Sequence, residues 1–598
     1  MAQAMAESNG RTTRHLSIAG NENYNRRWQA LNVMATLVMV VIFARLWQLQ
    51  IINHDIYIGL ASGQQELYRQ LFPKRGSIYA SERSDSGDIK QVSLAINRRA
   101  YLVYADTRSV VDPSRTASLL ADVLGMTTEE LLPILTKPDD PYEPIKSRVS
   151  EDVGERIKSL GLAGIELQEI TERFYPNNNI GSHILGFVNY QDNVLVGQYG
   201  VEGSFNKILS GTAGELRSER DARGVWIPMA DSEFIPAKDG ADVVLTVDWP
   251  IQFNACRALD EWVNQHGADG GSLIVIEPKT GAILAMCGSP DFNPNTFNEI
   301  KSLNIFNNPA TFLEYEPGSI MKAVTMAAAI DQQKIKPDTT YNDTGEVKFG
   351  TNTIRNSDNK SYGLQTMVEV LEKSLNTGAI YAMRQLDPTV FKKYFDDFGF
   401  GRLTGLELKG EAVGDLSNLS EKNEIYRATA SFGQGIAVTP LQMVNAYAAL
   451  ANGGKLMEPF LIKEINYPDG RREKREPRVV RQVVSERTAT VIGGMLVSVV
   501  ERGHGKRGGV NGYYIAGKTG TAEIPLKDGR GYEQGVNIGS FVGFGPVDDP
   551  RFAMIVRVDR PRDVKFAESS AAPLFGKVAK FILQYYEVPP RNDINQKN

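Results

Sequence analysis

Two stretches near the ends of the C-terminal half decide the fold. They are Ser272-Leu-Ile-Val-Ile-Glu-Pro-Lys-Thr-Gly-Ala-Ile-Leu-Ala-Met286 and Ser540-Phe-Val-Gly-Phe-Gly-Pro-Val-Asp-Asp-Pro-Arg-Phe-Ala-Met-Ile-Val-Arg-Val558. Each has two apolar, β-prone runs around a turn of Pro, Gly or Asp, which is typical of a β-hairpin. Helix-like stretches lie between the two hairpins. Strands at both ends of a domain predict one antiparallel sheet with the helices between them, an α+β arrangement.

The domain boundaries follow from the neighbouring segments. A strand at 243–247, a helix at about 251–266 and a last helix from 574 place this domain at residues 240–590, with a disordered tail at 591–598. Residues 55–235 mix short strands with helical stretches, which predicts an elongated mixed α/β module, here called the pedestal. The turn-forming segment from Phe234 to Ala241 is the expected linker.

The N-terminal residues predict a membrane location. Residues 1–27 are polar and rich in Arg, and an uncharged apolar stretch starts at Trp28. We interpret residues 28–52 as one transmembrane helix, with residues 1–27 in the cytoplasm and the rest of the chain outside. A cleaved signal peptide and a buried globular helix are the alternatives. Cys256 and Cys287 could form a disulfide outside the cell, but the sequence leaves their pairing open.

Composition excludes several functional classes. The 598 residues carry a net charge of −5, so the chain as a whole is not a basic nucleic-acid-binding protein. Two Cys and five His exclude a disulfide scaffold and leave little material for a metal centre. We expect neither a metal nor a cofactor.

The first candidate motif is Glu316-Pro-Gly-Ser319-Ile-Met-Lys322, followed by an apolar helix to Ile330. Ser319 falls where the helix should begin, and Lys322 lies one turn later, so its amine can reach the Ser319 hydroxyl. A buried lysine has a lowered pKa and can act as a base toward a serine nucleophile. The structural alternative is a capping serine followed by a solvated lysine.

Two further motifs lie at 373–378 and 515–522. Lys373-Ser374-Leu-Asn376 follows a helical run, where Ser and Asn are often only caps. Gly512-Tyr-Tyr-Ile-Ala-Gly-Lys518-Thr519 fits the phosphate-loop pattern. That pattern requires a helix after the Lys-Thr pair, which Gly520 and Pro525 oppose.

A strand is the preferred interpretation of the Lys518 segment. The edge of such a strand can bind an extended peptide, with Gly520 allowing close approach and with Lys518, Thr519 and Thr521 holding a carboxylate. A Ser-His-Asp triad is disfavoured because no Gly-x-Ser-x-Gly turn surrounds a serine here.

The ordered set Ser319-x-x-Lys322, Ser374-x-Asn376 and Lys518-Thr-Gly520 resembles the signature of serine penicillin-recognising enzymes. The chain is similar to the class B penicillin-binding proteins over nearly its whole length. Further matches in the transpeptidase domain are Gly433-Gln-Gly-Ile-Ala-Val-Thr-Pro-Leu-Gln442 and Ala451-Asn-Gly-Gly. Arg75-Gly-Ser-Ile, Arg173-Phe-Tyr-Pro, His183-Ile-Leu-Gly and Gly200-Val-Glu-Gly resemble the family's pedestal, a dimerisation-type module. Ser81-Glu-Arg departs from the turn usual after the first of these motifs.

The resemblance implies D,D-transpeptidation of peptidoglycan stem peptides. Ser319, deprotonated by Lys322, would attack the D-Ala–D-Ala bond, and the acyl-enzyme would pass to an amine of a neighbouring stem. The backbone N–H groups of Ser319 and Thr521 would stabilise the oxyanion. Ser374 would relay a proton, Asn376 would hold the substrate amide, and Lys518 with Thr519, Gly520 and Thr521 would bind the terminal carboxylate.

The resemblance also implies partners and leaves alternatives open. We expect penicillin and other β-lactams to bind, and a polytopic membrane glycosyltransferase and other cell-wall synthesis proteins to be partners, with no nucleic acid involved. A β-lactam sensor and a non-catalytic scaffold are the alternatives. A septal, division-type role is favoured slightly over an elongation role.

Overall fold

The computed structural model describes residues 21–48, 73–83, 89–191, 194–217, 233–526 and 531–591. The chain divides into two units, Met1–Pro73 with Ala213–Ala237, and Lys74–Thr212 with Lys238–Asn598. In the first unit the described elements are helix α1 (Asn21–Trp47) and the hairpin β7 (Glu215–Arg217) and β8 (Glu233–Ile235). The predicted tails at 1–27 and 591–598 lie mostly outside the described residues.

The segment predicted to cross the membrane is helical up to Trp47 in α1. Its residues 49–52 lie outside the described part of the chain. Among the described residues, and in contrast to the predicted span, no helix combines the length and the apolar character that a membrane crossing needs.

The predicted antiparallel sheet is confirmed in the second unit. It has five strands in the order β11 (Ile283–Ser289), β10 (Gly270–Ile276), β22 (Phe552–Asp559), β21 (Tyr532–Gly545) and β20 (Ala516–Pro525). All four pairings are antiparallel, with Ile274 opposite Met286 and Val542 opposite Ile555. The two hairpins quoted above therefore form its centre and one side, and β20 lies at an edge.

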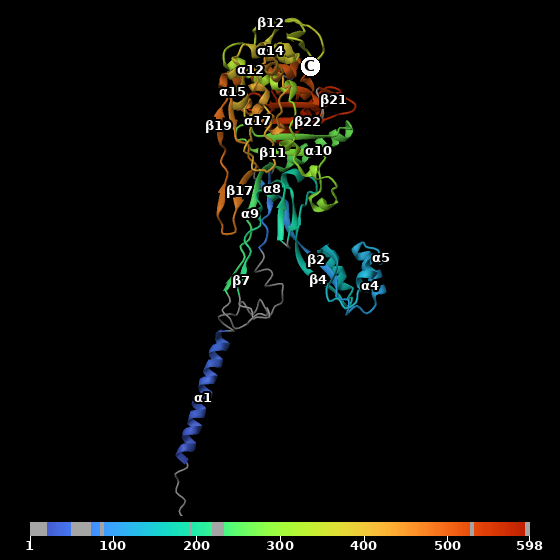
Figure 1. Cartoon of the computed structure of the whole chain (residues 1–598), viewed down its shortest axis with the longest axis vertical. Helices are drawn as coiled ribbons and strands as arrows, with labels where there is room; N and C mark the ends of the chain where they lie inside the picture. The colour runs from blue at the N-terminus through green and yellow to red at the C-terminus, as the bar shows by residue number, and fades with distance from the viewer. Residues whose placement is uncertain are drawn as a thin grey trace, which may run out of the picture. The chain divides into compact units, whose positions relative to one another are not determined.

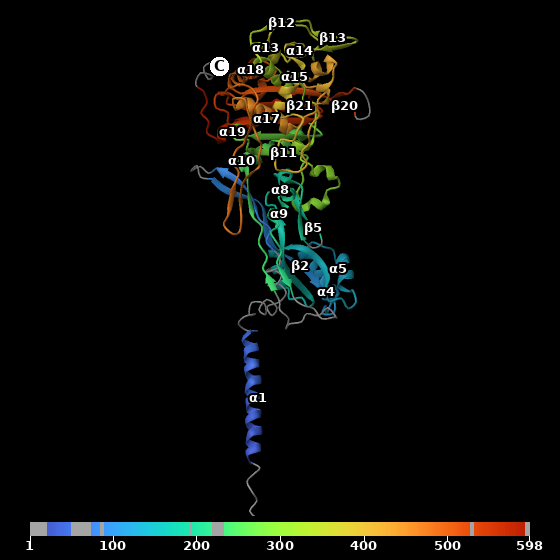
Figure 2. The ribbon, with the colours of Figure 1, turned by 60° about the vertical axis from the view of Figure 1, so that its left-hand side comes forward.

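Helices cover both faces of this sheet (Figures 1 and 2). On one face lie α10 (Trp249–Gln265) and α19 (Ala571–Tyr585), which bury Leu259, Phe575 and Ile582. On the other face α17 (Pro440–Ala451) packs on β10, β21 and β22. A disulfide between Cys256 and Cys287, which the sequence left open, joins α10 to β11.

A helical region lies beyond α17. Its helices are α12 (Lys322–Asp331), α13 (Met367–Glu372), α14 (Asn376–Arg384), α15 (Pro388–Asp397), α16 (Glu424–Ala430) and α18 (Glu486–Arg502). The alanine-rich α12 is buried on nearly every side, as its all-round apolar sequence predicts. Short strand pairs border this region: β12 (Thr340–Asp343) with β15 (Gly363–Thr366), β13 (Glu346–Phe349) with β14 (Asn352–Arg355), and β16 (Lys455–Met457) with β19 (Val479–Gln482).

A second, seven-stranded sheet contains four of the eight strands described in the pedestal. Its order is β18 (Arg472–Lys474), β17 (Ile462–Asn466), β9 (Asp242–Asp248), β1 (Ile78–Arg83), β2 (Ile89–Ala105) and β3 (Glu143–Ser150), with β4 (Ile165–Phe174) paired to β2. Helices α4 (Pro113–Leu124), α5 (Thr128–Leu135) and α6 (Glu151–Ser159) share a small core with β2. The second unit also contains the hairpin β5 (Phe187–Gln191) and β6 (Val194–Gln198), the short helices α7 (Ser182–Leu185), α8 (Gly200–Ser204) and α9 (Asn206–Leu209), and the 3₁₀ turn η2 (Pro294–Glu299).

The strand at 243–247 belongs to this second sheet, not to the five-stranded one. As β9 it pairs in parallel with β1 and antiparallel with β17. Val243, Leu245 and Val247 are fully buried, and parallel strands covered on both faces are typically continuous apolar runs. Periodicity shows that such a run is a strand but not which sheet it joins.

Candidate active site

Ser319 lies in a tight turn that leads into α12. The 3₁₀ turn η4 (Gly318–Met321) holds it, and Gly318 has a left-handed φ of 61°. The amide of Gly318 donates to the carbonyl of Gly433 at 3.0 Å, and a Cβ on Gly433 would lie 2.2 Å from the Gly318 oxygen. The Tyr447 hydroxyl donates to the carbonyl of Ile320 at 2.8 Å. The turn that carries Ser319 is therefore held from two directions.

Lys322 is the first residue of α12 and is fully buried, as predicted. Its Nζ donates to the carbonyl oxygen of Ser374 at 2.5 Å and to the Ser374 Oγ at 3.2 Å. Lys322 lies one turn after Ser319, and its amine points to Ser374 in the second motif. A hydrogen bond of this kind to the nucleophile often forms only when substrate is bound.

Lys518 reaches the same hydroxyl from the opposite side. It is fully buried in β20, and its Nζ donates to the Ser374 Oγ at 3.0 Å and to the Thr519 carbonyl at 3.1 Å. Ser374 lies between α13 and α14 with a φ of 57°, a conformation that a residue other than glycine rarely adopts without a functional reason. With both lysines as donors, the Ser374 hydroxyl keeps its own proton for a third group.

Burial changes the charge on both amines. Removal from water holds the pKa of Lys322 well below its ordinary value, and the neighbouring positive charge of Lys518 lowers it further. Burial lowers the pKa of Lys518 to about 7. Two ammonium groups around one hydroxyl repel each other, so near neutral pH one amine of the pair is neutral and can accept a proton.

The strand interpretation of the Lys518 segment is confirmed, because residues 516–525 form the edge strand β20. Gly520 explains how close this strand comes to the turn that carries Ser319. A Cβ on Gly520 would lie 2.6 Å from the Ser540 Oγ and 2.8 Å from the Pro317 carbonyl oxygen. The missing side chain thus brings β20 against the loop that carries Ser319.

The remaining predicted residues lie around this centre. Asn376 begins α14, and its Nδ2 donates to the Arg355 carbonyl at 2.9 Å. Thr519 is buried and next to the Lys518 amine. The Thr521 hydroxyl accepts from the amide of Ala567 at 3.1 Å, which leaves its proton for a ligand.

A buried carboxylate that the sequence analysis missed supports the Ser374–Asn376 loop. Asp343, at the end of β12, accepts from the Thr377 hydroxyl at 2.6 Å, from Asn356 Nδ2 at 3.0 Å, and from the amides of Gly345 and Tyr362. Thr377 directly follows Asn376 in the first turn of α14. In the sequence, Asp343 stands in an Asn-Asp-Thr-Gly stretch that only indicates a turn.

Models of two known protein domains match this chain. Residues 271–580 match the model of the penicillin binding protein transpeptidase domain, and residues 70–245 match that of the penicillin-binding protein dimerisation domain. The chain belongs to the penicillin-binding protein transpeptidase family. It is therefore a penicillin-binding protein of α+β fold with an N-terminal dimerisation-type module, as the motifs indicated.

Two named relatives align with this penicillin-binding protein over nearly its whole length. Stage V sporulation protein D of Bacillus subtilis is 34% identical over 585 residues, 96% of this chain and 88% of that protein. Peptidoglycan D,D-transpeptidase FtsI of Escherichia coli is 28% identical over 93% of this chain and 91% of its own length.

Solved structures agree with this fold. Penicillin binding protein 3 of Mycobacterium tuberculosis, in complex with aztreonam, aligns with a TM-score of 0.67 and 26% identity over 88% of this chain and 98% of its own. Penicillin binding protein 2X of Streptococcus thermophilus aligns with a TM-score of 0.70 and 26% identity over 86% and 80%.

Proposed function

We propose that this penicillin-binding protein is a serine D,D-transpeptidase that cross-links peptidoglycan stem peptides through an acyl-enzyme. One observation carries the proposal. The buried amines of Lys322, one helical turn after Ser319 in the sequence, and of Lys518, on the edge strand β20, both donate to the Ser374 hydroxyl. Solvated capping residues would not need two desolvated amines around one hydroxyl.

In this mechanism the neutral Lys322 amine takes the Ser319 proton as Oγ attacks the carbonyl between the two terminal D-alanines. The backbone N–H groups of Ser319 and Thr521 stabilise the resulting oxyanion. Ser374, which accepts from both lysines, passes its proton to the leaving D-alanine amine and takes one back from the Lys322 ammonium. An amine of a second stem then attacks the acyl-enzyme, and its proton passes through Lys322 to the Ser319 oxygen as the ester bond breaks.

The substrate groups are held from the strand side. Lys518, with the hydroxyls of Thr519 and Thr521, binds the terminal carboxylate, and Gly520 lets the peptide and the nucleophile turn approach the same strand. Asn376 orients the substrate amide. β-Lactams acylate Ser319 because they present a strained amide beside a carboxylate in the same site.

The decisive experiment labels the full chain with a fluorescent penicillin and follows D-alanine release from a stem pentapeptide. Ser319→Ala is expected to abolish both signals, while Ser302→Ala, an exposed serine without a side-chain cap bond, keeps both. Labelling that survives in Ser319→Ala overturns the nucleophile. Labelling without D-alanine release in the wild type favours the β-lactam sensor, and the absence of both favours the scaffold.

The site of action is proposed to be outside the cytoplasmic membrane. The Cys256–Cys287 disulfide supports this location, since such bonds persist mainly in oxidising compartments. Residues 28–52 would anchor the chain with residues 1–27 inside, because α1 exposes apolar side chains such as Leu37 and Phe43. Protease treatment of intact protoplasts tests this topology: residues 240–590 should be cut and residues 1–27 protected.

We also propose that the pedestal covers residues 55–235 and the transpeptidase domain residues 240–590. We further propose a septal role beside a polytopic glycosyltransferase. The near full-length likeness to proteins named FtsI supports the septal assignment. Depletion in the source cell separates the roles: filaments are expected for a septal enzyme, and rounded cells for an elongation enzyme. Cross-linking from the pedestal to a glycosyltransferase tests the partner.

A further inference from the structure

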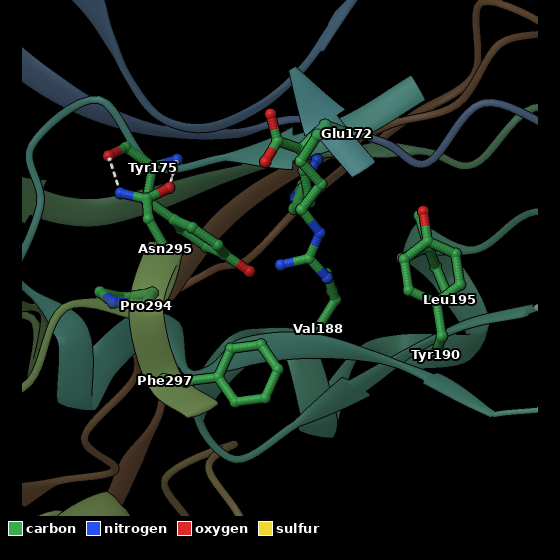
Figure 3. Close-up of a pocket in the computed structure, with 10 residues that line it drawn as sticks. Glu172, Tyr175, Val188, Tyr190, Leu195, Pro294, Asn295 and Phe297 are labelled. Carbon is green, nitrogen blue, oxygen red and sulfur yellow. Dashed lines mark hydrogen bonds between the residues drawn. The ribbon is translucent and has the colours of Figure 1, made fainter. Parts of the chain in front are cut away.

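A pocket opens in the pedestal, away from Ser319, between strands β3 and β4, the hairpin β5–β6 and the turn η2. Arg173 lies in it, and Figure 3 shows Tyr190 and Leu195 on one side, with Asn295 and Phe297 on another. Phe297 stacks on Phe187 with ring centroids 4.2 Å apart, which fixes this wall. The Asn295 side chain bonds both the amide and the carbonyl of Tyr175.

The charges behind the pocket do not balance. Glu202 is fully buried and pairs with two buried arginines, Arg75 at 2.6 Å and Arg173 at 2.7 Å. Two guanidinium groups and one carboxylate leave a net positive charge in the interior. Such a charge is costly without a partner.

The excess charge faces the pocket. Arg173 has a side chain only 1% exposed, its Nε donates to Glu202 and its Nη1 to Asn97 at 3.2 Å. Its Nη2 is buried and has no partner among the described residues. An unpaired buried donor costs about 1–3 kcal/mol, and more when it is charged.

The other charges at the pocket add to the imbalance. Glu172 is already paired with Arg98 at 2.8 Å. Arg148 is exposed at the rim, near the ring of Tyr190, and makes no ion pair within the described part of the chain. The pocket therefore contains a buried guanidinium that shares its acid, Glu202, with Arg75, and an exposed guanidinium without an ion pair among the described residues. A water molecule could accept from Nη2 but would leave this excess positive charge uncompensated.

We propose that this pocket binds a carboxylate, which accepts from Nη2 of Arg173 and pairs with Arg148 at the rim. One carboxylate oxygen can accept from Nη2, the one Arg173 nitrogen without a partner among the described residues, and the other can face Arg148 at the rim. The rings of Phe297 and Tyr190, on different sides of the pocket, offer surfaces against which the methylene groups of an acidic side chain can pack. The site stands apart from the acyl-transfer chemistry and does not depend on it.

The test measures the binding of capped glutamate (N-acetyl-glutamate methylamide) to the full chain in detergent, by ligand-observed NMR, with the capped glutamine analogue as the neutral control. Binding in the millimolar range is expected for glutamate, and at least tenfold weaker binding for glutamine. Equal binding of the two compounds, or no glutamate binding at 50 mM, a concentration of about ten times the expected Kd, overturns the proposal.

Variants distinguish binding at this pocket from a general effect of positive charge on the protein. Arg148→Ala is expected to weaken glutamate binding about threefold to tenfold, while Arg156→Ala, an exposed arginine on α6, leaves it unchanged. Arg173→Lys keeps a cation for Glu202 but removes Nη2, and should abolish binding while the thermal transition persists. Equal binding in Arg148→Ala and Arg156→Ala contradicts the site, even if Arg173→Lys fails to fold.

A last comparison identifies the source of the carboxylate. Acetate that binds as tightly as capped glutamate assigns the pocket to a free small anion, and glutamate that binds much more tightly assigns it to an acidic side chain of a polypeptide. Penicillin labelling of Arg148→Ala should equal that of the wild type, so failure here is distinct from failure of the transpeptidase proposal.

Discussion

At the scale of single residues, the site depends on the removal of two amines from water. Lys322 and Lys518 are both fully buried, and the positive charge of Lys518 lowers the pKa of Lys322. The motif spacing indicates that Lys322 is near Ser319, but only burial makes a lysine a base near neutral pH. The hydroxyl of Ser374 then receives both amines.

The first prediction concerns the pH dependence of acylation. In the proposed mechanism the neutral form of Lys322 is the active one, so the rate of acylation by penicillin should rise with pH as that amine loses its proton. Lys518→Ala removes a positive charge that lowers the Lys322 pKa. The Lys322 pKa should therefore rise, and the rising part of the curve of acylation rate against pH should move to higher pH. Lys373→Ala, a partly exposed lysine paired with Glu369, is the control. A limb that stays in place in Lys518→Ala would contradict the coupling.

Lys518 also makes the stability of the folded protein depend on pH. The pKa of Lys518 is about 7 in the folded protein and near 10.5 in an unfolded chain, so the unfolded state binds more protons between these values. Stability should therefore rise with pH from about 7 to about 10 through this group. Urea unfolding at several pH values measures the slope, which Lys518→Met should reduce.

Gly520 carries the next prediction. Gly520→Ala places a Cβ against Ser540 Oγ and the Pro317 carbonyl, so β20 must move away from the nucleophile turn. We expect penicillin acylation to slow at least tenfold, with a stability loss of about 1–3 kcal/mol. The control is Gly494→Ala in α18, where a Cβ meets nothing within 4 Å and a gain of about 0.5–1 kcal/mol is expected. Unchanged acylation in Gly520→Ala would show that the close approach is unnecessary.

At the scale of elements, the Ser374–Asn376 loop depends on a contact between β12 and α14. Asp343 binds Thr377, Asn356 and two loop amides at once, so one carboxylate fixes the start of α14 relative to the strand pair β12–β15. No motif contains Asp343. Its importance arises because the chain returns to it from residues 356, 362 and 377.

Asp343→Asn tests this support. An amide keeps the shape but turns an N–H group toward donors, which leaves buried groups unpaired at a cost of about 1–3 kcal/mol. The Ser374 loop should loosen, with slower acylation. The catalytic pH profile should stay in place, because neither lysine is changed. Asp358→Asn, which alters exposed bonds to the Tyr362 hydroxyl and the Lys360 amide, is the matched control. A pH profile that moves with Asp343→Asn would refute a purely positioning role.

At the scale of the second unit, one sheet connects sequence-distant parts of the chain. Strands β17 and β18, from the C-terminal half, and β9 and β1 lie in the sheet that continues into the pedestal. The buried group of Arg75, Glu202 and Arg173 ties the segment before β1, and strand β4, to α8. The pedestal and the transpeptidase domain therefore share a structural element.

Glu202→Ala tests this connection. It leaves two buried guanidinium groups without an acid, at a cost of about 3–5 kcal/mol. Calorimetry should show a lower transition temperature for the pedestal and for the domain with which it shares the sheet. Glu155→Ala, in an exposed pair with Lys158, should leave the trace unchanged. Two transitions, of which only one moves, would show that the two parts unfold independently.

Local sequence patterns predict the class of the fold, and the ordered motifs predict the chemistry of the candidate site through their resemblance to a known family. The hairpins at 272–286 and 540–558, the apolar helix after Lys322 and the strand at Lys518 all depend on local periodicity and turn residues, which act over a few positions. Tertiary structure alone decided which sheet β9 joins, that Lys322 points to Ser374, that Asp343 supports α14, and that Arg173 faces a pocket with an unpaired nitrogen. Each of these depends on which distant segments become neighbours, because burial and charge pairing are properties of the packed chain and not of any short stretch.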